Sequence, residues 1–399
     1  MNEELNRHLA NNYGIENSDD DAYAKWKESH QPFHWFTEFY EIVVNNGGFD
    51  VIIGNPPYVE YRNVLSHYTI LDVYDTFSCA NLYAFVLERS CKMLKSAGYM
   101  SFIVPLTASH TNQMMPLQNM FAQHSTHLAA FCGDTNPSVL FTGARMQLLI
   151  CRLEKNNFPQ LFNTNYIRFY GSERTVLFHS KIVYFCDKEA MTEYCGTFPK
   201  RANTLGKQAL TKLFLKSNKK TLAHFYSHDD SHVGYYLTSF SYFARAFTFA
   251  PEFRNEQQGT GVSSHCKKLA FSDERSRNCA IAAICSSLFY FYWQAFSYGR
   301  QLNAREIDNF PIDLKRFTNT ETLSNAALEL NNDFIANSEI RKTQNQRTGY
   351  SEQQIFYPKK SKALMNIIDL ILARTLGFDE KELDFIINYD AKFRVCDDI

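Results

Sequence analysis

A short apolar run that ends in two consecutive prolines constrains this sequence most. The run is Phe49-Asp50-Val51-Ile52-Ile53-Gly54, and the tetrapeptide Asn55-Pro56-Pro57-Tyr58 follows it directly. The length of the run and its β-branched residues predict a buried parallel β-strand. Two prolines exclude both a helix and a strand ladder, because each has a fixed φ and no N–H group. The tetrapeptide therefore follows the carboxyl end of a strand, where open α/β sheets bind their ligands.

The tetrapeptide has the chemistry to hold a flat heterocycle with an exocyclic amine. Asn55 offers a side-chain carbonyl oxygen, the two prolines offer only backbone carbonyl oxygens, and Tyr58 offers an aromatic face. Two acceptors that pull on the amine hydrogens favour a tetrahedral nitrogen with a localised lone pair, which can attack a methyl sulfonium. A base of a duplex reaches such a pocket only when it is flipped out. The alternative is a simple proline turn after a strand.

Helix-like and strand-like segments alternate after the tetrapeptide. Helical spacing predicts helices over 82–95 and 114–123. Short apolar runs predict buried strands over 99–105, 128–132 and 146–153. This alternation favours an α/β fold with a largely parallel sheet.

The composition is that of an ordinary globular protein. The chain has 399 residues, of which 45% are hydrophobic, and this length favours two domains. The net charge of -1 gives no evidence for or against nucleic-acid binding by the chain as a whole. The amino terminus lacks the features of a secretory signal, and the ten cysteines are most simply free thiols. We therefore expect a cytoplasmic protein.

We expect neither a membrane span nor a metal site. The most apolar run, 280–296, is shorter than the roughly 20 residues that cross a bilayer, so we interpret it as a buried core helix. His124 with His127, and His228 with His232, have the spacing of metal ligands. Neither pair has a convergent cysteine or third histidine, so we interpret all four as surface histidines.

The character of the sequence changes near residue 156, where asparagine, lysine and aromatic residues become more frequent. We expect a first domain over 1–155, a linker region over 156–200 and a second domain over 201–399. Residues 200–220 contain seven lysines or arginines and no acidic residue. A helix in this segment would expose lysines, among them Lys212 and Lys216, either for contact with DNA phosphates or simply as a solvated face. The buried stripe of that helix would consist of Ala209, Leu210, Leu213 and Phe214.

The segment from Phe49 to Val59 closely resembles the catalytic motif of amino-group DNA methyltransferases, and more narrowly that of adenine-specific enzymes of the type IIG restriction–modification kind. Weaker similarities to that family occur along the chain. Residues 30–36 resemble the family's segment before the motif, 81–85 and 98–105 its next helix and strand, and 137–141 the loop that helps to hold the flipped base. Residues 298–302 and 310–312 resemble its target-recognition region, and 382–390 its carboxyl-terminal segment. The resemblance extends over nearly the whole chain, and the tetrapeptide is its strongly specific motif.

The resemblance implies a site-specific DNA methyltransferase of a restriction–modification system, which transfers a methyl group from S-adenosylmethionine to N6 of a flipped adenine. Asn55 and the carbonyl group of Pro56, which Pro57 follows in the motif, would polarise the target amine. Tyr58 would stack on the base. Phe141 would pack on the other face of the base, or belong to the core instead.

The resemblance also implies the fold and the partners. The first domain would be the later half of a doubly wound, Rossmann-like methyltransferase sheet, and the second a mixed α+β target-recognition domain. Double-stranded DNA would be the partner, with Arg300 and Arg305 reaching a base edge or a phosphate. A structural ion pair, for instance with Glu306, is the alternative role for these arginines.

The sequence departs from the family at one point. The Gly-rich loop that holds S-adenosylmethionine is not found before the tetrapeptide, and the Gly-x-Gly at 259–261 follows a polar segment typical of a flexible loop. We therefore expect a carboxyl-terminal fragment or split subunit that needs a separate amino-terminal methyltransferase half. In its absence, one side of the strand over 49–54 would be an unpaired apolar edge.

Two further functions fit the same residues. The chain could be a non-catalytic DNA-specificity module, or a degenerate fragment that retains only the recognition domain. The tetrapeptide could also serve the methylation of a protein or RNA amine.

Overall fold

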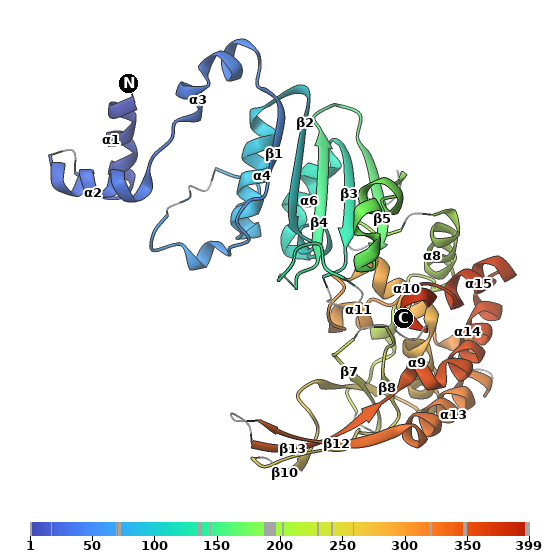
Figure 1. The fold of residues 1–399 in the computed structure, drawn as a ribbon. Helices are drawn as coiled ribbons and strands as arrows, with labels where there is room; N and C mark the ends of the chain where they lie inside the picture. Colours follow the sequence, from blue (N-terminus) through green and yellow to red (C-terminus); the bar gives the residue numbers. More distant parts are fainter. Residues whose placement is uncertain are drawn as a thin grey trace. The chain divides into compact units, whose positions relative to one another are not determined.

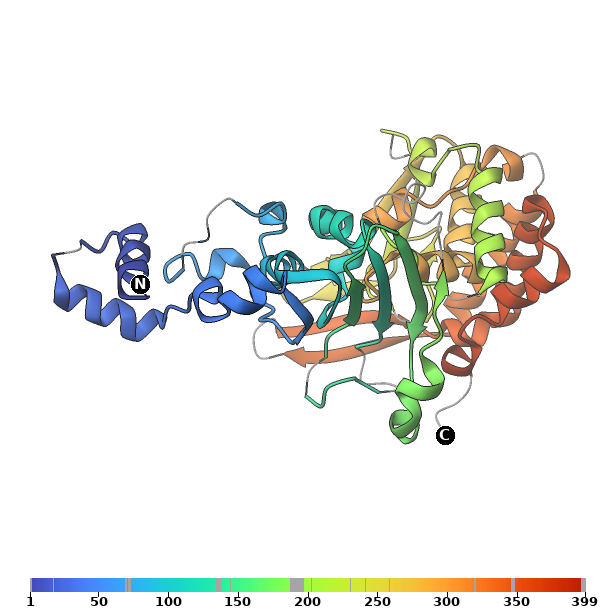
Figure 2. The ribbon, with the colours of Figure 1, turned by 90° about the horizontal axis from the view of Figure 1, so that it is seen from above.

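The computed structural model describes residues 2–395 except 17, 69, 71–72, 134–137, 144, 187–196, 202, 230, 241, 258, 319–320 and 346–348. The chain divides into two compact units, Met1–Pro199 and Lys200–Ile399. Figure 1 shows the helices and strands of both units, and Figure 2 shows them after a turn of 90°.

A six-stranded mixed sheet forms the centre of the first unit. Its strand order is β1-β2-β4-β3-β5-β6. The pairs β1/β2 and β3/β5 are parallel, whereas β2/β4, β4/β3 and β5/β6 are antiparallel. The strands are β1 (Phe49–Gly54), β2 (Leu94–Pro105), β3 (Ser125–Phe131), β4 (Leu148–Glu154), β5 (Gln160–Ile167) and β6 (Phe185–Cys186). The prediction of a largely parallel sheet is therefore wrong, because β4 runs back along β3 and inserts between it and β2.

The predicted elements of this unit are confirmed within a few residues at their ends. The helices expected over 82–95 and 114–123 are α4 (Leu82–Met93) and α6 (Met115–Ala122), and the three expected strands are β2, β3 and β4. The unit also contains α1 (Asn2–Asn12), α2 (Asp20–His30), α3 (Trp35–Glu38), η1 (Glu41–Asn45), η2 (Tyr61–Asn63), η3 (Phe77–Cys79), α5 (Thr107–His110), η4 (Asn112–Met114), η5 (Gly171–Val176) and η6 (Leu177–Lys181).

Both faces of the sheet are covered. Along β3, Leu128 and Ala130 belong to one hydrophobic cluster, and Ala129 and Phe131 belong to a second. Because successive side chains of a strand point to opposite faces, the two clusters lie on opposite faces of the sheet. Helices α4 and α6 pack against β2 and β3 and contribute to the first cluster (Figure 1). The second cluster includes Leu177, the first residue of η6.

Strand β1 is an edge strand whose apolar side chains are largely exposed. It pairs with β2 in parallel, as expected, but it has no second neighbour among the described strands. Val51 is 59% exposed and Ile53 is 75% exposed. The prediction that this strand is buried is therefore wrong: a strand side chain is buried only where another layer covers its face of the sheet, and the face that carries Val51 and Ile53 is left open.

The segment over 156–200 is ordered where the structure describes it. Residues 160–167 form β5 of the central sheet, and η5, η6 and β6 follow. Residues 187–196 of the expected linker lie outside the described residues. As far as it is described, this segment belongs to the first compact unit up to Pro199, and Lys200 begins the second.

The second unit combines two antiparallel sheets with buried helices, as expected for a mixed α+β unit. One sheet has the order β11-β7-β8, and the other has the order β10-β9-β13-β12. The strands are β7 (His232–Leu237), β8 (Ala246–Phe247), β9 (Phe253–Asn255), β10 (Gly259–Gly261), β11 (Cys266–Phe271), β12 (Ser338–Asn345) and β13 (Gly349–Phe356). The Gly-x-Gly segment forms β10, so the expectation of a loop there is wrong.

The helices of the second unit gather beside the three-stranded sheet, and the four-stranded sheet extends away from them (Figure 1). They are α8 (Thr204–Lys216), α9 (Glu274–Cys285), α10 (Ser287–Phe296), α11 (Ala304–Asp308), α12 (Lys315–Thr318), α13 (Thr322–Ala336), α14 (Lys362–Leu376), α15 (Glu380–Ile387) and α16 (Ala391–Arg394), with the 3₁₀ turns η7 (Leu222–Phe225) and η8 (Pro358–Ser361). In α8, Ala209, Leu210 and Leu213 are buried as predicted.

The apolar run over 280–296 is buried but consists of two helices. α9 ends at Cys285, and the hydroxyl oxygen of Ser286 accepts the N–H of Phe289 at 3.0 Å to begin α10. The buried carboxylate of Asp369 also accepts the N–H of Ser287 at 2.8 Å. In the described part of the chain, no single helix is long and apolar enough to cross a membrane; α9 and α10 would meet that test only as a pair, and they are bent by 65°.

Candidate active site

The tetrapeptide Asn55-Pro56-Pro57-Tyr58 follows the carboxyl end of β1, as the sequence predicts. Asn55 and Pro57 are exposed, Pro56 is buried and Tyr58 is half-buried. Gly54, which precedes Asn55, lies beside Phe102 of β2, and a Cβ atom at this position would come within 2.9 Å of the Phe102 ring. A glycine is therefore needed at position 54, the last residue of β1 before Asn55.

The side chain of Tyr58 links the tetrapeptide to the central sheet. Its hydroxyl oxygen lies 2.6 Å from Oδ1 of Asn55 and 2.8 Å from the carbonyl oxygen of Ile103 in β2. A phenol has one hydrogen, so it can donate to only one of these two oxygens. The amide group of Asn55 can turn so that Nδ2 donates to the phenol oxygen while the phenol donates to Ile103. In that arrangement all three groups are satisfied, and Oδ1 of Asn55 remains available.

The surroundings of Tyr58 keep its hydroxyl group protonated. Burial, with a smaller contribution from the nearby Cys151 thiol, raises the pKa of Tyr58 to about 12. The Tyr58 ring contacts the Tyr83 ring edge-on at 6.5 Å and packs against both clusters of the sheet. Tyr58 thus lies where the two core layers meet, and its ring is held at the end of the strand.

Phe141 contacts the second hydrophobic cluster, as Tyr58 does. Its side chain is half-buried. The preceding residues are held by Arg174 of η5, which donates to the carbonyl oxygens of Val139 at 3.0 Å and Leu140 at 2.7 Å. Pro137, the first residue of the loop predicted to carry Phe141, lies outside the described residues.

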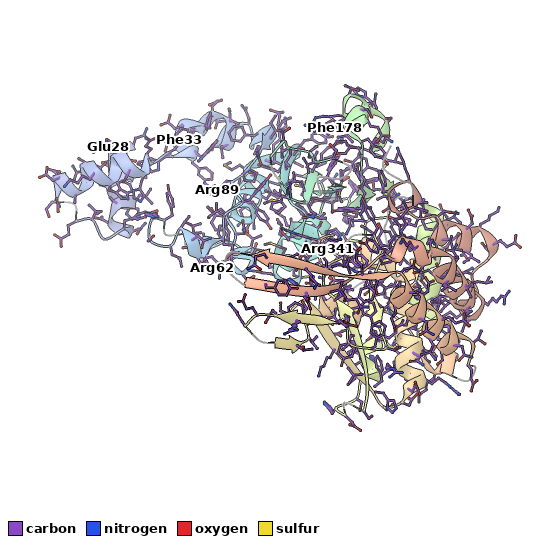
Figure 3. The ribbon with its side chains drawn as sticks, turned by 60° about the horizontal axis from the view of Figure 1, so that its bottom comes forward. Glu28, Phe33, Arg62, Arg89, Phe178 and Arg341 are labelled. Carbon is purple, nitrogen blue, oxygen red and sulfur yellow. The ribbon has the colours of Figure 1, made fainter. Side chains whose placement is uncertain are left out.

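A wide apolar cavity opens beside the tetrapeptide. It has a volume of about 1010 Å³, and its walls include Val51 and Ile53 of β1 and Pro57. Trp35, Tyr68, Tyr74 and Phe85 add aromatic surface, and Arg89 adds one cation. Figure 3 shows the position of Arg89 on α4. The lining residues include no carboxylate, the group that typically holds the ribose of a nucleotide cofactor. The cavity therefore fits apolar or aromatic groups.

The predicted DNA-contacting residues of the second unit fall into two kinds. Lys212 and Arg305 are engaged within the protein: Lys212 pairs with Glu382 at 2.6 Å, and Arg305 pairs with Glu306 at 2.7 Å and donates to the carbonyl oxygen of Phe296. Lys216 and Arg300 are exposed. Contact of any of the four with DNA stays a prediction.

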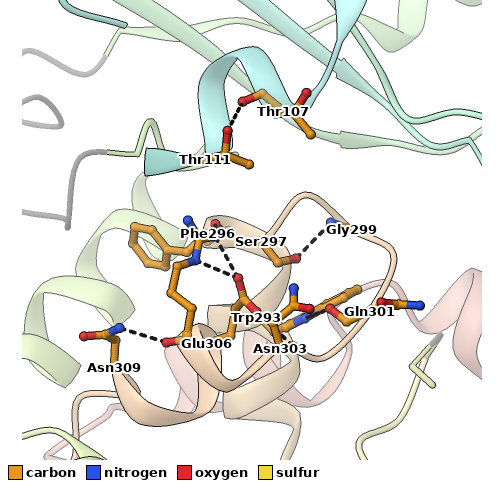
Figure 4. Close-up of polar contacts among 12 residues, drawn as sticks. Thr107, Thr111, Trp293, Phe296, Ser297, Gly299, Gln301, Asn303, Glu306 and Asn309 are labelled. Atoms are coloured by element: carbon orange, nitrogen blue, oxygen red, sulfur yellow. Dashed lines mark hydrogen bonds and ion pairs between the residues drawn. The ribbon is translucent and has the colours of Figure 1, made fainter. Parts of the chain in front are cut away.

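Arg300 lies on a turn that contacts of its neighbours Gly299 and Gln301 hold in place. Figure 4 labels these two neighbours together with Ser297 and Trp293. The N–H of Gly299 donates to Oγ of Ser297 at 3.0 Å, and Nε1 of Trp293 donates to the carbonyl oxygen of Gln301 at 3.3 Å. The carboxylate of Glu306, besides pairing with Arg305, accepts the N–H of Asn303 at 3.1 Å. The ion pair that the sequence offered as an alternative role for the arginines thus exists for Arg305.

The histidine pairs do not converge on a site. His127 is half-buried and stacks on Phe162 at 4.2 Å, and burial lowers its pKa. His124 contacts the carbonyl oxygen of Asn156 at 2.9 Å. No group of three or more histidine, cysteine or acidic side chains able to hold a metal ion occurs in the described ranges.

Sequence reasoning singled out the segments of Tyr83 and Ile103 but assigned neither the Tyr83 ring nor the Ile103 carbonyl group to the site, and it missed Arg174. Each reaches the site from a position far away in the chain, and no local pattern marks any of them. Only the pairing of the strands brings Ile103 to Tyr58, across 45 residues.

Comparison with known proteins gives one family match. Residues 2–132 match the family model described as Eco57I restriction-modification methylase. A curated relative, a putative type II restriction enzyme and methyltransferase of Methanocaldococcus jannaschii, is 42% identical over 80 residues. That alignment covers 20% of this chain and 6% of the relative. The similarity therefore concerns a small part of a much longer protein.

Two solved structures of restriction–modification enzymes show weak similarity. The type IIL enzyme MmeI in complex with DNA has 10% identity and a TM-score of 0.41, over 86% of this chain and 57% of MmeI. A nuclease-deletion mutant of the type ISP enzyme LlaGI, in complex with a DNA substrate mimic, has 10% identity and a TM-score of 0.38, over 96% of this chain and 55% of LlaGI.

The family match includes β1, the tetrapeptide, α4, β2 and β3. Residues 2–132 of this chain are therefore similar to the Eco57I restriction-modification methylase family.

Proposed function

We propose that the chain takes part in methylation of N6 of adenine in double-stranded DNA, within a restriction–modification system. The observation that carries this proposal is the placement of Asn55 at the open end of β1, with the Tyr58 hydroxyl beside its amide. The match of residues 2–132 to a restriction-modification methylase family supports it. The adenine specificity rests on the resemblance of the segment from Phe49 to Val59 to adenine-specific enzymes, because the acceptors alone would fit the amine of cytosine equally well.

Asn55 and the carbonyl group of Pro56 are the proposed acceptors for the two hydrogens of the target amine. They withdraw the hydrogens from the plane of the base, so that the nitrogen lone pair becomes localised and nucleophilic. Positive charge develops on this nitrogen during methyl transfer, and fixed oxygen dipoles stabilise that charge. The Tyr58 hydroxyl is proposed to fix the orientation of the Asn55 amide.

The flipped base is proposed to lie between Tyr58 and Phe141. Both rings are half-buried and pack against the same core cluster, which restricts their movement. Arg174 fixes the loop in front of Phe141 through two backbone carbonyl groups. Flipping costs a few kcal/mol of unstacking and unpairing, which stacking on two aromatic rings offsets.

The methyl donor of the proposed reaction is S-adenosylmethionine, whose sulfonium supplies an electrophilic methyl group. The residues described around the tetrapeptide fit the target amine, and the apolar cavity lacks carboxylates for a ribose. We therefore assign no donor-binding residue to this chain. A separate amino-terminal methyltransferase half is proposed to supply that site.

The edge strand β1 is the proposed junction with that half. Its outer edge carries backbone groups without a neighbouring strand among the described residues, and Val51 and Ile53 are exposed beside it. A strand added there would continue the sheet and make β1 an internal strand of a doubly wound, Rossmann-like fold. The second unit is proposed to be the target-recognition part, with Arg300 and Lys216 free to reach DNA and Lys212 and Arg305 in supporting roles.

The test measures transfer of a radiolabelled methyl group to DNA by the full chain, together with an amino-terminal methyltransferase half of the same family. Asn55→Ala is expected to lower the rate at least a hundredfold. Asn11→Ala, which removes an exposed asparagine on α1, serves as the matched control. Undiminished transfer by Asn55→Ala would remove the proposed role. DNA binding without methyl transfer by the complemented wild type would favour a non-catalytic specificity module.

A further inference from the structure

Glu88 of α4 carries a buried carboxylate that no function above uses. Its side chain is 5% exposed, and its two oxygens accept three hydrogen bonds from the segment that precedes α4. The N–H of Asp75 donates at 3.1 Å, the N–H of Thr76 at 2.8 Å and the hydroxyl group of Thr76 at 2.7 Å. Lys92, one turn further along α4, pairs with the same carboxylate. Hydrogen bonds to an ionised group are the stronger ones, so Glu88 holds this segment firmly.

The carboxylate of Glu88 is directed at the protein and not at a ligand. Burial alone would raise the pKa of Glu88, but the hydrogen bonds from Lys92 and Thr76 outweigh burial and hold this pKa below its ordinary value. Among the described residues, Arg89 and Ser90 line the apolar cavity, whereas Glu88 does not. The contacts of the carboxylate are therefore those with residues 75–76 and with Lys92.

The segment that Glu88 holds contains a strained turn. After Thr76, which is 1% exposed, the chain forms η3 and then passes through Ala80 with a φ of 52°. This left-handed conformation is unfavourable for alanine, because its Cβ atom crowds the following carbonyl group. Such a conformation persists where the surrounding structure fixes it. Glu88 fixes the chain before the turn, and α4 begins at Leu82 directly after it.

The same turn anchors the chain that leaves the tetrapeptide. The N–H of Tyr61 donates to the carbonyl oxygen of Ala80 at 2.9 Å, and the N–H of Leu82 donates to the carbonyl oxygen of Val59 at 3.0 Å. We call these two hydrogen bonds the anchor. The two prolines of the tetrapeptide have no N–H group to donate. The backbone of the tetrapeptide therefore depends on the pairing of β1 before it and on the anchor after it.

We propose that Glu88 is a positioning residue for methyl transfer. Its carboxylate fixes Thr76 and the turn, the turn fixes the anchor, and the anchor holds the tetrapeptide in the conformation in which Asn55 and Tyr58 meet the base. This inference rests on the proposed function, because it assigns to a residue outside the motif the rigidity that fixed oxygen dipoles need. If Glu88 served stability alone, its loss would leave the anchor and the rate of methyl transfer unchanged in the folded chain.

Three variants separate these two roles. Glu88→Gln keeps the shape of the side chain but replaces one acceptor oxygen by a donor NH₂ group, so it cannot accept all three bonds from residues 75–76. Lys92→Met removes the ion pair and leaves those three bonds in place. Asp313→Asn is the matched control in the second unit. The Asp313 side chain is 7% exposed, pairs with Lys220 at 3.2 Å and also accepts a backbone N–H group.

The first test measures hydrogen exchange of the backbone amides in the full chain without any partner. Glu88→Gln is expected to speed exchange about tenfold at Thr76 and also at Tyr61, whereas Lys92→Met and Asp313→Asn leave both amides unchanged. Faster exchange at Thr76 with unchanged exchange at Tyr61 would overturn the inference, because Glu88 would then not act on the anchor. Unchanged exchange at both amides would overturn it as well.

A milder variant covers the case in which Glu88→Gln does not fold. Thr76→Val keeps the shape of the threonine and removes one of the three hydrogen bonds to Glu88. It should speed exchange at Tyr61 in the same direction by a smaller factor. Thermal unfolding shows which variants are folded, and unchanged exchange at Tyr61 in a folded Thr76→Val chain would count against the inference.

The second test measures methyl transfer to DNA by the full chain with the amino-terminal half, at several DNA concentrations. Glu88→Gln is expected to lower kcat about tenfold and to leave KM for DNA within about twofold, since a small misplacement of reacting groups slows chemistry. Lys92→Met and Asp313→Asn should retain the wild-type kcat. An equal loss of kcat with Glu88→Gln and Asp313→Asn would contradict a positioning role.

The two tests distinguish failure of this inference from failure of the proposed function. Wild-type kcat with Glu88→Gln, in an assay in which the complemented wild type is active, would overturn the inference and leave the proposed function intact. Absence of methyl transfer by the complemented wild type would remove the proposed function and the positioning role with it. Exchange at Tyr61 would still show whether Glu88 fixes the anchor.

Discussion

The hydroxyl group of Tyr58 lies between the side-chain amide of Asn55, at 2.6 Å, and the carbonyl oxygen of Ile103, at 2.8 Å. Ile103 belongs to β2, so the hydroxyl group connects the proposed catalytic amide to the interior of the sheet. A hydroxyl donates one hydrogen and also accepts, which makes it suited to fix the direction of the amide. Tyr58 would therefore have two functions, one from its ring and one from its oxygen.

Removal of the Tyr58 oxygen alone should separate these functions. Tyr58→Phe keeps the ring and loses the hydroxyl contacts, so Asn55 is no longer held in one orientation. We expect methyl transfer by the complemented chain to fall about three- to tenfold, the equivalent of one hydrogen bond of roughly 1 kcal/mol. Tyr58→Ala, which also removes the ring, should lower the rate further, and a single-turnover assay measures both. Equal rates for Tyr58→Phe and the wild type would contradict an orienting role.

The raised pKa of Tyr58 should make the free energy of unfolding depend on pH in the alkaline range. The pKa of Tyr58 is raised from 10.0 to about 12, so the unfolded chain loses this proton first. The stabilising contribution is therefore complete below about pH 10 and is lost as the pH rises towards about 12. We expect the wild type to lose free energy of unfolding relative to Tyr58→Phe only above about pH 10, as measured by urea denaturation. A change in this difference at neutral pH would contradict the assignment.

The exposed edge of β1 should govern self-association of the isolated chain. Unpaired strand edges with apolar side chains pair with other chains, and a lysine on the edge prevents this. Ile53→Lys is expected to reduce association in light scattering without loss of folding, since Ile53 is 75% exposed. Phe158→Lys replaces a 77% exposed residue away from this edge and should change nothing. Equal association of all three proteins would show that β1 is not the contact.

The two predicted lysines of α8 should behave differently. Lys212 pairs with Glu382, which is 2% exposed, whereas Lys216 is exposed. Lys212→Ala removes the ion pair of the buried Glu382 carboxylate and should lower the free energy of unfolding by about 1–3 kcal/mol. Lys216→Ala should leave stability within about 0.5 kcal/mol, as for most surface substitutions. Urea denaturation distinguishes them, and equal stabilities would contradict a structural role for Lys212.

The local sequence pattern was sufficient to predict the strand and the helix around the tetrapeptide. The apolar run of β1, its abrupt end at Pro56 and the helical spacing of α4 are properties of short segments, and the structure confirms them. Ser286 was also readable as the start of a helix, because serine caps helix amino termini. The apolar character of the surrounding run concealed that signal.

Long-range pairing could not be predicted in the same way. The insertion of β4 between β2 and β3 depends on strand contacts across the whole unit, so alternation of elements alone suggested a largely parallel sheet. The exposure of Val51 and Ile53 likewise depends on what covers the edge, not on the residues themselves. The ion pair of Arg305 with its neighbour Glu306 depended on side-chain direction, which the sequence leaves open.

The most direct test of the central claim is the identity of the methylated nucleoside. DNA treated with the complemented chain and a labelled methyl donor is digested to nucleosides and analysed by mass spectrometry. The account predicts label in N6-methyladenine with the wild type and its loss with Asn55→Ala. Label in methylated cytosine alone, or N6-methyladenine at the same level with Asn55→Ala, would contradict it.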